Sequence, residues 1–343
     1  MPFPVRALKC ALVTGATGML GSYLVERLLA DGCAVRALVR DTEAAQWLAS
    51  LGAALVRGDV TEERGVLDAA SGCDAVFHAA AAIGPGSDLE AFRALNVSGT
   101  QHVIRAASAA GARLVHVSST AVYDDEARAR FAPVAEEVPV SRLPDGDAYG
   151  RSKQEAEAAV LRAHADGVVW ASVVRPPVMY GRRDRQFIPR IAPVLSWGFF
   201  PVIDGGRSTF LLVHAGAVAD GAVRAATVDG AGGRVYHLTN DFAVSVAEFA
   251  RLAGVGLGRH IRTPSVSLDV AQGFFRALGL ACTLAGRADL AVHAPGSLAL
   301  LSRDNPFTSE RARRELGWSP PVPPSVALPE AFRWWKDRAA REG

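Results

Sequence analysis

Two residues that can exchange protons, Tyr149 and Lys153, lie four positions apart in segment 148–165, whose Ala-rich pattern predicts a helix. This spacing places both side chains on one helix face, about one turn apart. A phenol with a pKa of about 10 is a poor acid or base at neutral pH, but an adjacent ammonium group favours the phenolate and lowers that pKa. Tyr149 could then take a proton from an alcohol or return one to a carbonyl. Because Tyr-x-x-x-Lys is common in helices, the pair alone proves little.

A cluster of hydroxyl groups follows a predicted strand. Segment 114–118 has the apolar, β-branched pattern of a strand and leads into Ser118, Ser119 and Thr120. In a parallel sheet these residues would lie at the carboxyl edge, where open α/β folds bind ligands. A hydroxyl there can hydrogen-bond a substrate oxygen and stabilise the charge that develops on it. Together with Tyr149 and Lys153, the hydroxyls indicate acid–base chemistry on an alcohol or a ketone.

Gly15, Gly18 and Gly21 stand at three-residue spacing between a predicted strand, 10–14, and a predicted apolar helix, 19–30. Glycine allows a tight turn, close approach of a pyrophosphate to the backbone, and packing of helix against strand; the helix amino terminus offers unpaired N–H groups to an anion. At a first strand–helix junction this pattern predicts a dinucleotide site, although an ordinary tight turn is the alternative. An oxidised nicotinamide would add its positive charge to that of Lys153. The turn residues expected to bind the cofactor are Gly15, Thr17, Gly18, Met19 and Leu20.

The tip of the second predicted strand, 35–39, bears on the choice between NAD(H) and NADP(H). An acidic residue there would bind the adenosine ribose and repel a 2′-phosphate, whereas an arginine would pair with that phosphate. Because Arg40 follows this strand, we expect NADP(H) to be preferred; NAD(H) is possible, since Asp41 could still reach the ribose. Arg36 or Arg40 could instead be merely solvated.

Asp59 and Val60 follow the third predicted strand, 54–57, and are included among the expected cofactor-binding residues. An acidic side chain at this position could hydrogen-bond the adenine amine. Asp59 could equally cap a helix predicted at 61–70, so both interpretations stay open.

The elements that must position these residues alternate regularly between short β-branched segments and longer Ala- and Leu-rich ones. Such alternation is typical of βαβ units, in which helices cover both faces of a parallel sheet. The predicted fold class is therefore α/β: a Rossmann-type, doubly wound parallel sheet of about seven strands, with a smaller, mostly helical C-terminal substrate domain. The predicted strands are 10–14, 35–39, 54–57, 74–78, 114–118 and 168–175, and the predicted helices are 19–30, 42–51, 62–70, 88–110 and 148–165.

The alternation loosens in two places. Segment 124–147 is rich in proline and acidic residues, which predicts a surface loop at the carboxyl edge of the sheet. From Gly181 onward prolines and aromatic residues become frequent. We therefore assign 1–180 to a dinucleotide-binding domain, and 181–206 with 241–343 to a substrate-binding domain. Residues 207–240 are expected to return to the first domain, with sheet segments at 209–226 and 235–238.

The bulk composition argues against several classes of protein. With 37 basic and 35 acidic residues the 343-residue chain has a net charge of +2, so no global field would recruit nucleic acid or an anionic membrane. The four cysteines show neither the density of a disulfide scaffold nor a metal-ligand spacing, so no metal is expected. No secretion signal is evident, and charged residues interrupt the apolar segment 266–301, so we expect no integral membrane span and a cytoplasmic location. Peripheral membrane contact by that segment and a homodimer remain open, and the expected partner is a small-molecule substrate.

Six motifs, spread in order over more than half of the chain, resemble those of the extended short-chain dehydrogenase/reductases, in the NAD-dependent epimerase/dehydratase superfamily. They are TGATGMLG at 14–21, HAAA at 78–81, NVSGT at 96–100, VSSTAVY at 117–123, YGRSK at 149–153 and RPPVMYG at 175–181. Two positions depart from the family pattern: Asp124 stands where many members have glycine, and Arg182 where many have proline. The loops that touch substrate are therefore expected to be atypical.

The resemblance implies roles for individual residues. It implies Ser119 as the catalytic hydroxyl, with Thr120 or Ser118 as fallback. It implies Tyr149 as the acid/base and Lys153 as an additional grip on the nicotinamide ribose. The further cofactor-binding residues that it implies are Ala79, Ala80, Ala81, Pro176 and Val178.

The segments 274–301 and 300–318 resemble the 3β-hydroxysteroid dehydrogenase-like branch, whose substrates are steroids, sterols or other hydrophobic alcohols and ketones. We therefore expect an NAD(P)-dependent oxidoreductase that moves hydride between the cofactor and a secondary alcohol or ketone, with a steroid-, sterol- or polyketide-like substrate. Several apolar side chains could line a pocket for such a ligand or simply form the core of the smaller domain. They are Phe199, Phe200, Phe274, Phe275 and Leu278.

Two alternative functions stay open. A nucleotide-sugar epimerase or reductase would share the catalytic set and would need grips for a diphosphate, for which Arg207 and Arg182 or Arg183 are candidates. A sugar dehydratase is disfavoured, because Ser119 is not followed by the Asp-Glu pair of those enzymes. A non-catalytic NADP(H)-sensing protein belongs to a different class, and such proteins typically lack the Tyr/Lys pair that this chain retains.

Overall fold

The computed structural model describes residues 6–84, 88–130, 133–240, 242, 244–273, 276–277 and 306–342. The chain divides into two compact units. The first comprises Met1–Pro177, Ala215–Thr239 and Pro306–Pro321, and the second Val178–His214, Asn240–Asn305 and Val322–Gly343. These bounds differ from the predicted domains at 178–180, 207–214 and 240, which fall in the second unit, and at 306–321, which fall in the first. The substrate-binding role of the second unit stays a prediction.

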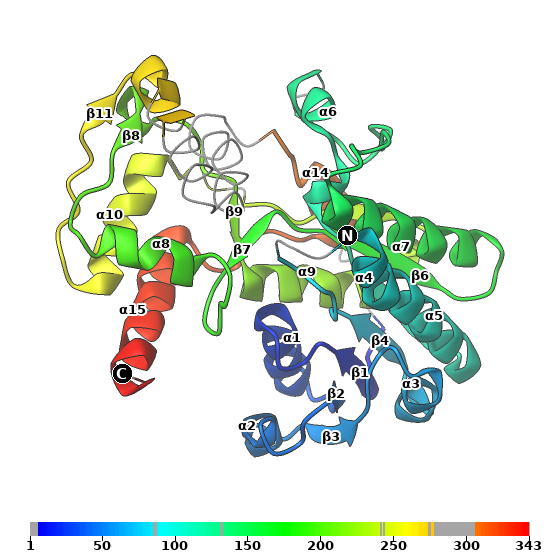
Figure 1. The fold of residues 1–343 in the computed structure, drawn as a ribbon. Coiled ribbons are helices and arrows are strands. Elements are labelled where there is room, and N and C mark those ends of the chain that lie inside the picture. The colour runs from blue at the N-terminus through cyan, green and yellow to red at the C-terminus, as the bar shows by residue number, and fades with distance from the viewer. Residues whose placement is uncertain are drawn as a thin grey trace. The chain divides into compact units, whose positions relative to one another are not determined.

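A seven-stranded parallel sheet, in the order β10-β6-β5-β4-β1-β2-β3, forms the centre of the first unit (Figure 1). The strands are β1 (Cys10–Thr14), β2 (Ala34–Val39), β3 (Ala54–Arg57), β4 (Ala75–His78), β5 (Arg113–Val117), β6 (Ala171–Arg175) and β10 (Val235–His237). Since the chain order reverses between β1 and β4, their carboxyl ends form the switch point at which doubly wound sheets bind ligands. The predicted α/β class and the number of strands are confirmed.

Helices cover both faces of this sheet (Figure 1). On one face α1 (Met19–Ala30) packs against α9 (Ala215–Thr227), and on the other α3 (Glu63–Ala70), α5 (Gly99–Ala110) and α7 (Ala148–Ala165) lie side by side. The central strands β1, β4, β5 and β6 are buried on both sides, which explains their continuous apolar runs.

Several predicted elements differ from the structure. The helix predicted at 88–110 is divided into α4 (Leu89–Phe92), a π-helical segment (Arg93–Ser98) and α5. The helix predicted at 42–51 is only α2 (Gln46–Ser50), because the Asp41 carboxylate accepts hydrogen bonds from Glu43 N and Ala44 N at 2.9 and 3.0 Å and holds a turn before it. The loop predicted at 124–147 contains the short helix α6 (Asp125–Arg130).

The sheet segment predicted at 209–226 is wrong. Only Leu212–His214 is extended, as β9, and it pairs with β7 (Val178–Tyr180) in a separate two-stranded sheet. Residues Ala215–Thr227 form α9 instead, because their alanines and valines bury most of a helix against the main sheet. The return to the main sheet is made by β10 alone.

The core of the second unit is aromatic. Helices α8 (Ile188–Leu195), α10 (Val246–Leu257) and α15 (Pro324–Glu342) surround it, with the short pair β8 (Val202–Ile203) and β11 (Ser265–Val266) nearby. Four rings meet edge to face or tilted, with centroids 4.7 to 6.0 Å apart: Phe187, Phe210, Phe249 and Phe332. Phe200 belongs to the same buried cluster, whereas Phe199 is 49% exposed. Phe274, Phe275 and Leu278 lie outside the described residues.

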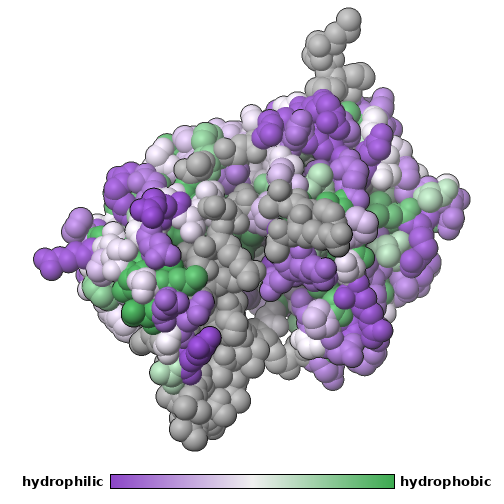
Figure 2. All heavy atoms as spheres, turned by 90° about the horizontal axis from the view of Figure 1, so that it is seen from above, coloured by the Kyte–Doolittle hydropathy of each residue, from purple (hydrophilic) through white to green (hydrophobic). Residues whose placement is uncertain are grey.

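The described surface is mostly hydrophilic on the face that Figure 2 shows, with hydrophobic residues gathered in small areas. Among the described helices, none combines the length and apolar character needed to cross a bilayer.

Substituting Phe249 with alanine should destabilise the protein by about 3–5 kcal/mol, because the ring is fully buried and touches three other aromatic rings. Val255→Ala on the same helix is the matched control, since Val255 is 53% exposed and its loss should change the free energy of unfolding by less than about 0.5 kcal/mol. Chemical denaturation of both variants measures this. Equal effects would show that the ring cluster does not stabilise the unit.

Candidate active site

The glycine turn between β1 and α1 leaves no space for side chains. Gly15 has a φ of +68°, and a Cβ there would lie 2.7 Å from Ala80 N. A Cβ on Gly21 would lie 2.1 Å from Gly15 O, and one on Gly18 3.1 Å from the same oxygen. The turn therefore packs directly on the carboxyl end of β4, at residues 79–80. Gly18 begins α1, whose first turn carries no acidic residue, so nothing on this helix end repels an anion.

The other predicted turn residues differ in exposure. Thr17 and Met19 are half-buried, and Leu20 is buried in the core. Ala79, Ala80 and Ala81 follow β4 and are half-buried beside the turn.

A chain of buried hydrogen bonds fixes the carboxyl end of β4. His78 Nδ1 lies 2.8 Å from Thr14 Oγ1, and His78 Nε2 lies 2.9 Å from Thr100 Oγ1. The Thr100 hydroxyl donates its single proton to Asn96 O at 2.6 Å, so His78 Nε2 donates and Nδ1 accepts. Burial lowers the pKa of His78 to about 3, which keeps the ring neutral.

Asn96 joins this end of β4 to α7. Its Oδ1 accepts from Ala82 N at 2.7 Å, and its Nδ2 donates to Ala82 O at 3.2 Å and to Ser152 Oγ at 3.0 Å. Ser152 in turn donates to Tyr149 O at 2.7 Å. The sequence motif contained Asn96 without suggesting this role; a signal for it was the presence of an amide side chain within a helical segment that must be buried.

Tyr149 and Ser119 meet because α7 begins unusually close to the end of β5. A Cβ on Gly150 would lie 2.8 Å from Ala121 O, and Asp147 caps the helix by accepting from Gly150 N at 2.8 Å. Ser119 lies close enough to the Tyr149 phenol to lower its pKa, and the Ser119 Oγ accepts from Ala121 N at 3.1 Å. By contrast, Ser118 Oγ is buried and has no hydrogen-bond partner within the described ranges. Of the three candidate hydroxyls, Ser119 is the one placed against the tyrosine.

The electrostatics of Tyr149 differ from the expectation. The pKa of Tyr149 is raised to about 12, chiefly by burial, while Ser119 lowers it and Asp147 raises it. The predicted lowering by Lys153 is not found in the protein alone, because the ammonium is directed elsewhere: Lys153 Nζ donates to Val117 O at 2.6 Å. The phenol is consequently protonated at neutral pH.

Lys153 itself is buried beside the carboxyl end of β5. Desolvation lowers the pKa of Lys153 to about 8, and the carboxylate of Glu157 opposes this shift. The amine is therefore still mostly protonated at pH 7.

The tip of β2 presents two exposed arginines rather than one. Arg40 is exposed just beyond β2, and Arg57 ends β3 in register with Val39, so both lie at the same corner of the sheet. The sequence reasoning missed Arg57, because strand register is needed to place it. Arg36 donates to Ala69 O and Ser71 O at 3.0 and 2.6 Å, so its guanidinium group binds the carboxyl end of α3. Asp41 Oδ1 holds its own turn.

Asp59 also serves its own turn. Its Oδ1 accepts from both Thr61 N and Thr61 Oγ1 at 2.9 Å. The helix that follows, α3, begins at Glu63 and has Glu62, not Asp59, as its N-cap residue. Val60 is buried, and its carbonyl accepts from His102 Nδ1 at 2.8 Å. The predicted contact of these residues with adenine remains a prediction.

The remaining predicted residues lie around the junction of the two units in sequence. Pro176 is buried, and its carbonyl accepts from Thr120 N at 3.0 Å. Val178 is 38% exposed in β7 of the second unit. Arg182 forms an ion pair with Glu330 at 3.5 Å, Arg183 has a φ of +66°, and Arg207 is exposed.

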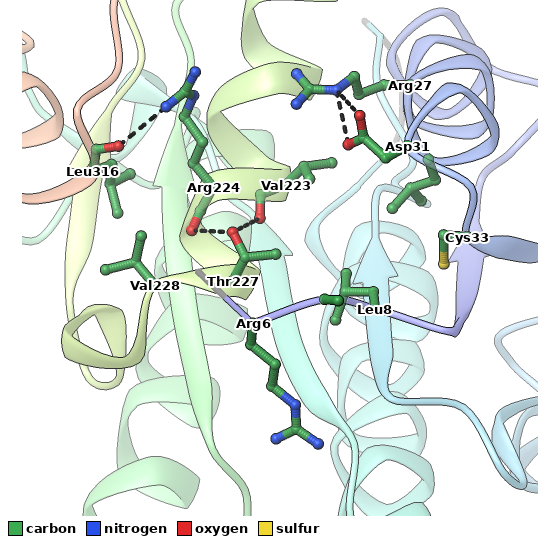
Figure 3. A pocket seen from close by; sticks show the side chains of 12 residues that line it. Arg6, Leu8, Arg27, Asp31, Cys33, Val223, Arg224, Thr227, Val228 and Leu316 are labelled. Atoms are coloured by element: carbon green, nitrogen blue, oxygen red, sulfur yellow. Dashed lines mark hydrogen bonds and ion pairs between the residues drawn. The ribbon is translucent and has the colours of Figure 1, made fainter. Parts of the chain in front are cut away.

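A cavity of about 380 Å³ in the first unit lies away from these residues (Figure 3). It is lined by the segment before β1 and by the last turns of α1 and α9, so it opens at the amino edge of the sheet. Arg27 binds Asp31 at 3.0 Å, and Arg224 reaches Leu316 O at 3.4 Å. These cations face the negative ends of helices, so we assign the cavity a structural role.

Comparison with known proteins shows the family. Residues 11–238 match the NAD dependent epimerase/dehydratase family. The chain is 34% identical over 315 residues to a 4-hydroxy-2-methyl-3-oxo-4-farnesyl-3,4-dihydroquinoline-1-oxide ketoreductase from Stigmatella aurantiaca, which covers 90% of this chain and 91% of that protein. A 3-beta-hydroxysteroid dehydrogenase from Mycolicibacterium neoaurum is 26% identical over 95% of this chain and 91% of its own length.

Solved structures agree in fold. The crystal structure of gox2253 superposes with a TM-score of 0.74 at 26% identity, covering 96% of this chain and 98% of the other. A short-chain dehydrogenase/reductase superfamily protein from Agrobacterium tumefaciens with bound NAD gives a TM-score of 0.69 at 23% identity, over 97% and 99% of the two chains. From its sequence relatives and this fold, the chain belongs to the NAD-dependent epimerase/dehydratase family of extended short-chain dehydrogenase/reductases, in the 3β-hydroxysteroid dehydrogenase-like branch, and is an NAD(P)-dependent oxidoreductase.

Proposed function

We propose that this enzyme reduces a hydrophobic ketone to a secondary alcohol, with Tyr149 as the proton donor and NADP(H) as the preferred cofactor. The observation that carries the proposal is the placement of Ser119, just beyond β5, close enough to Tyr149, at the start of α7, to lower the pKa of its phenol. Lys153 lies one turn farther along α7. Ser119, Tyr149 and Lys153 all belong to the unit that contains the glycine turn.

The residues of the turn fit a dinucleotide. At Gly15, Gly18 and Gly21, neighbouring backbone atoms occupy the space that a side chain would need. The first turn of α1 carries no acidic residue that would repel a phosphate. When bound, the nicotinamide supplies or accepts the hydride. The residues that we assign to hold the cofactor are Gly15, Thr17, Gly18, Met19, Leu20, Arg40, Asp59, Val60, Ala79, Ala80, Ala81, Tyr149, Lys153, Pro176 and Val178.

The protonation of Tyr149 at neutral pH suits this residue to the proton-donor role that reduction requires. A phenol with a pKa of about 12 holds its proton and can deliver it to a carbonyl oxygen as that oxygen becomes an alkoxide. Ser119 can donate a second hydrogen bond to the same oxygen and stabilise its charge. Lys153, held by the Val117 carbonyl, keeps a positive charge one helical turn after the tyrosine.

The hydrophobic nature of the substrate is supported by the relatives. One relative is named for a farnesyl-bearing ketone, and another is named 2-alkyl-3-oxoalkanoate reductase. A nucleotide sugar is less well supported, because Arg182, one of the candidate diphosphate grips, already pairs with Glu330. Loss of NADPH absorbance should therefore be fastest with a 3-ketosteroid or a long-chain β-keto ester. Turnover of UDP-glucose alone would overturn the substrate class.

Tyr149→Phe should lower kcat at least about 100-fold, because it removes the proton donor. The affinity for NADPH, measured by fluorescence titration, should change little, since one hydroxyl is lost and the ring remains against Phe92. A variant that keeps normal turnover would remove Tyr149 from the mechanism, and a variant that loses cofactor binding would indicate a structural role.

Arg40→Ala and Arg57→Ala should each weaken NADPH more than NADH, by about 1–3 kcal/mol if a charge-assisted bond to a 2′-phosphate is lost. Arg64→Ala is the matched control, because Arg64 is an exposed arginine of the same unit that pairs with Asp68 on α3. Dissociation constants for both cofactors measure the effect. Equal losses for NADPH and NADH would mean that these arginines do not select the phosphate.

A further inference from the structure

A belt of buried polar side chains crosses the sheet beneath the proposed site. Its members lie at or next to the carboxyl ends of neighbouring strands and share one face of the sheet, the face that α5 and α7 cover. They are Thr14, His78, His116, Ser118, Arg175 and His237, and each is at most 3% exposed. Apolar residues usually fill such positions, and burying polar side chains costs free energy, so the presence of this belt requires a compensating interaction.

One such interaction is an ion pair between this belt and α7. Arg175 Nε donates to Glu157 Oε2 at 2.9 Å, and Arg175 Nη2 donates to Glu157 Oε1, so the two groups are joined by two parallel bonds. Both side chains are at most 6% exposed. Arg175 also donates to the Tyr123 hydroxyl, which lies 3.0 Å from His237 Nε2. The carboxylate of Glu157 is thus held in position by Arg175 through both of its oxygens.

Glu157 stands four residues after Lys153, which itself stands four residues after Tyr149. The three side chains therefore occupy one face of α7, one turn apart. A buried ammonium is stable only with a compensating charge or several acceptors, and the Lys153 amine has one described acceptor, Val117 O.

The other titratable groups that face Lys153 offer no negative charge. His78 on β4 and His116 on β5 lie within the field of the ammonium, and burial holds the pKa of both far below the usual value, so both rings are neutral. Tyr149, on α7 itself, is a protonated phenol at neutral pH. Within the described part of the chain, Glu157 is the one carboxylate that acts on the amine, and it favours the charged form.

We propose that Glu157, clamped by Arg175, is a positioning residue that keeps Lys153 protonated and thereby sets the alkaline limit of catalysis. The proposal rests on the proposed function of Tyr149 and Lys153. Glu157 does not touch substrate or cofactor; it acts through the charge and position of the lysine. Removing the carboxylate should cause Lys153 to lose its proton at a lower pH, because the desolvation that disfavours the ammonium would then be unopposed.

The kinetic test is the pH profile of kcat for Glu157→Gln, with NADPH and whichever ketone, 3-ketosteroid or β-keto ester, gives the higher turnover. The alkaline limb should move to lower pH by about one unit, the size expected when a nearby opposite charge is lost. Glu155→Gln is the matched control, because Glu155 lies on the same helix but pairs with Arg93. The alkaline limb of the kcat profile of Glu155→Gln should lie at the same pH as that of the wild-type enzyme.

A second variant guards against misfolding, since Glu157→Gln alone leaves Arg175 buried without its partner. The double variant Glu157→Gln/Arg175→Gln removes both charges, so it should fold better while retaining the shifted limb. A limb that returns to its wild-type position in the double variant would show that the unpaired arginine, rather than the missing carboxylate, caused the shift, and would overturn the proposal.

A test without turnover separates this proposal from the proposed function. The pKa of Lys153 is about 8 in the folded protein and its ordinary value is 10.5, so the unfolded chain binds more protons between these values and stability should rise with pH across that window. In Glu157→Gln the rise should begin at lower pH, and in the Lys153→Met background Glu157→Gln should leave the pH dependence unchanged. A shift in stability without ketone turnover would sink only the proposed function. An unshifted stability profile would sink the role of Glu157.

Discussion

The burial of one ammonium group, that of Lys153, is the physical constraint on which the arrangement of several elements of the first unit depends. A charge removed from water is costly unless polar groups surround it, and here they come from several elements at once. The carboxyl end of β5 supplies a carbonyl, β4 and β5 supply neutral imidazoles, and α7 supplies a carboxylate that β6 holds in place. Parallel strands all end at the same edge of a sheet, and this makes such a convergence possible.

Local contacts fix the position at which α7, the helix that carries Lys153, begins. Gly150 allows the helix to touch the backbone after β5, and Asp147 caps it at that point. Asn96 then ties its first turn to the strand that supports the glycine turn. Ser119, Tyr149 and the start of α1, which is predicted to bind an anion, are therefore parts of one connected framework rather than separate motifs.

Much of this framework could be predicted from residue types and spacing. The alternation of segments predicted the parallel sheet, and the three glycines predicted the strand–helix junction, because both patterns act over a few residues. Ser119 was preferred over Thr120 and Ser118 through the resemblance alone, and the structure places it against Tyr149. The roles of these residues in catalysis and binding stay predictions.

What could not be predicted depends on register and burial. Arg57 lies beside Arg40 only because β3 pairs with β2 in one register, and a strand sequence does not state its register. The pKa of Tyr149 rises where a fall was expected, because the direction of the Lys153 amine and the burial of the phenol are tertiary properties. Likewise the prediction of a sheet segment at 209–226 was wrong for most of its length, because the apolar content of Ala215–Thr227, which forms α9, does not by itself tell a buried helix from a buried strand.

The π-helical segment Arg93–Ser98 carries a consequence of its own. A π turn accommodates one more residue than an α turn, as though a single amino acid had been inserted into a continuous helix. Asn96 lies inside that segment, so the wider turn sets the direction in which its amide points. Deleting one residue there would let α4 and α5 merge into a regular helix while rotating the amide away from Ala82 and Ser152, so chains of this kind should tolerate length changes in this helix poorly.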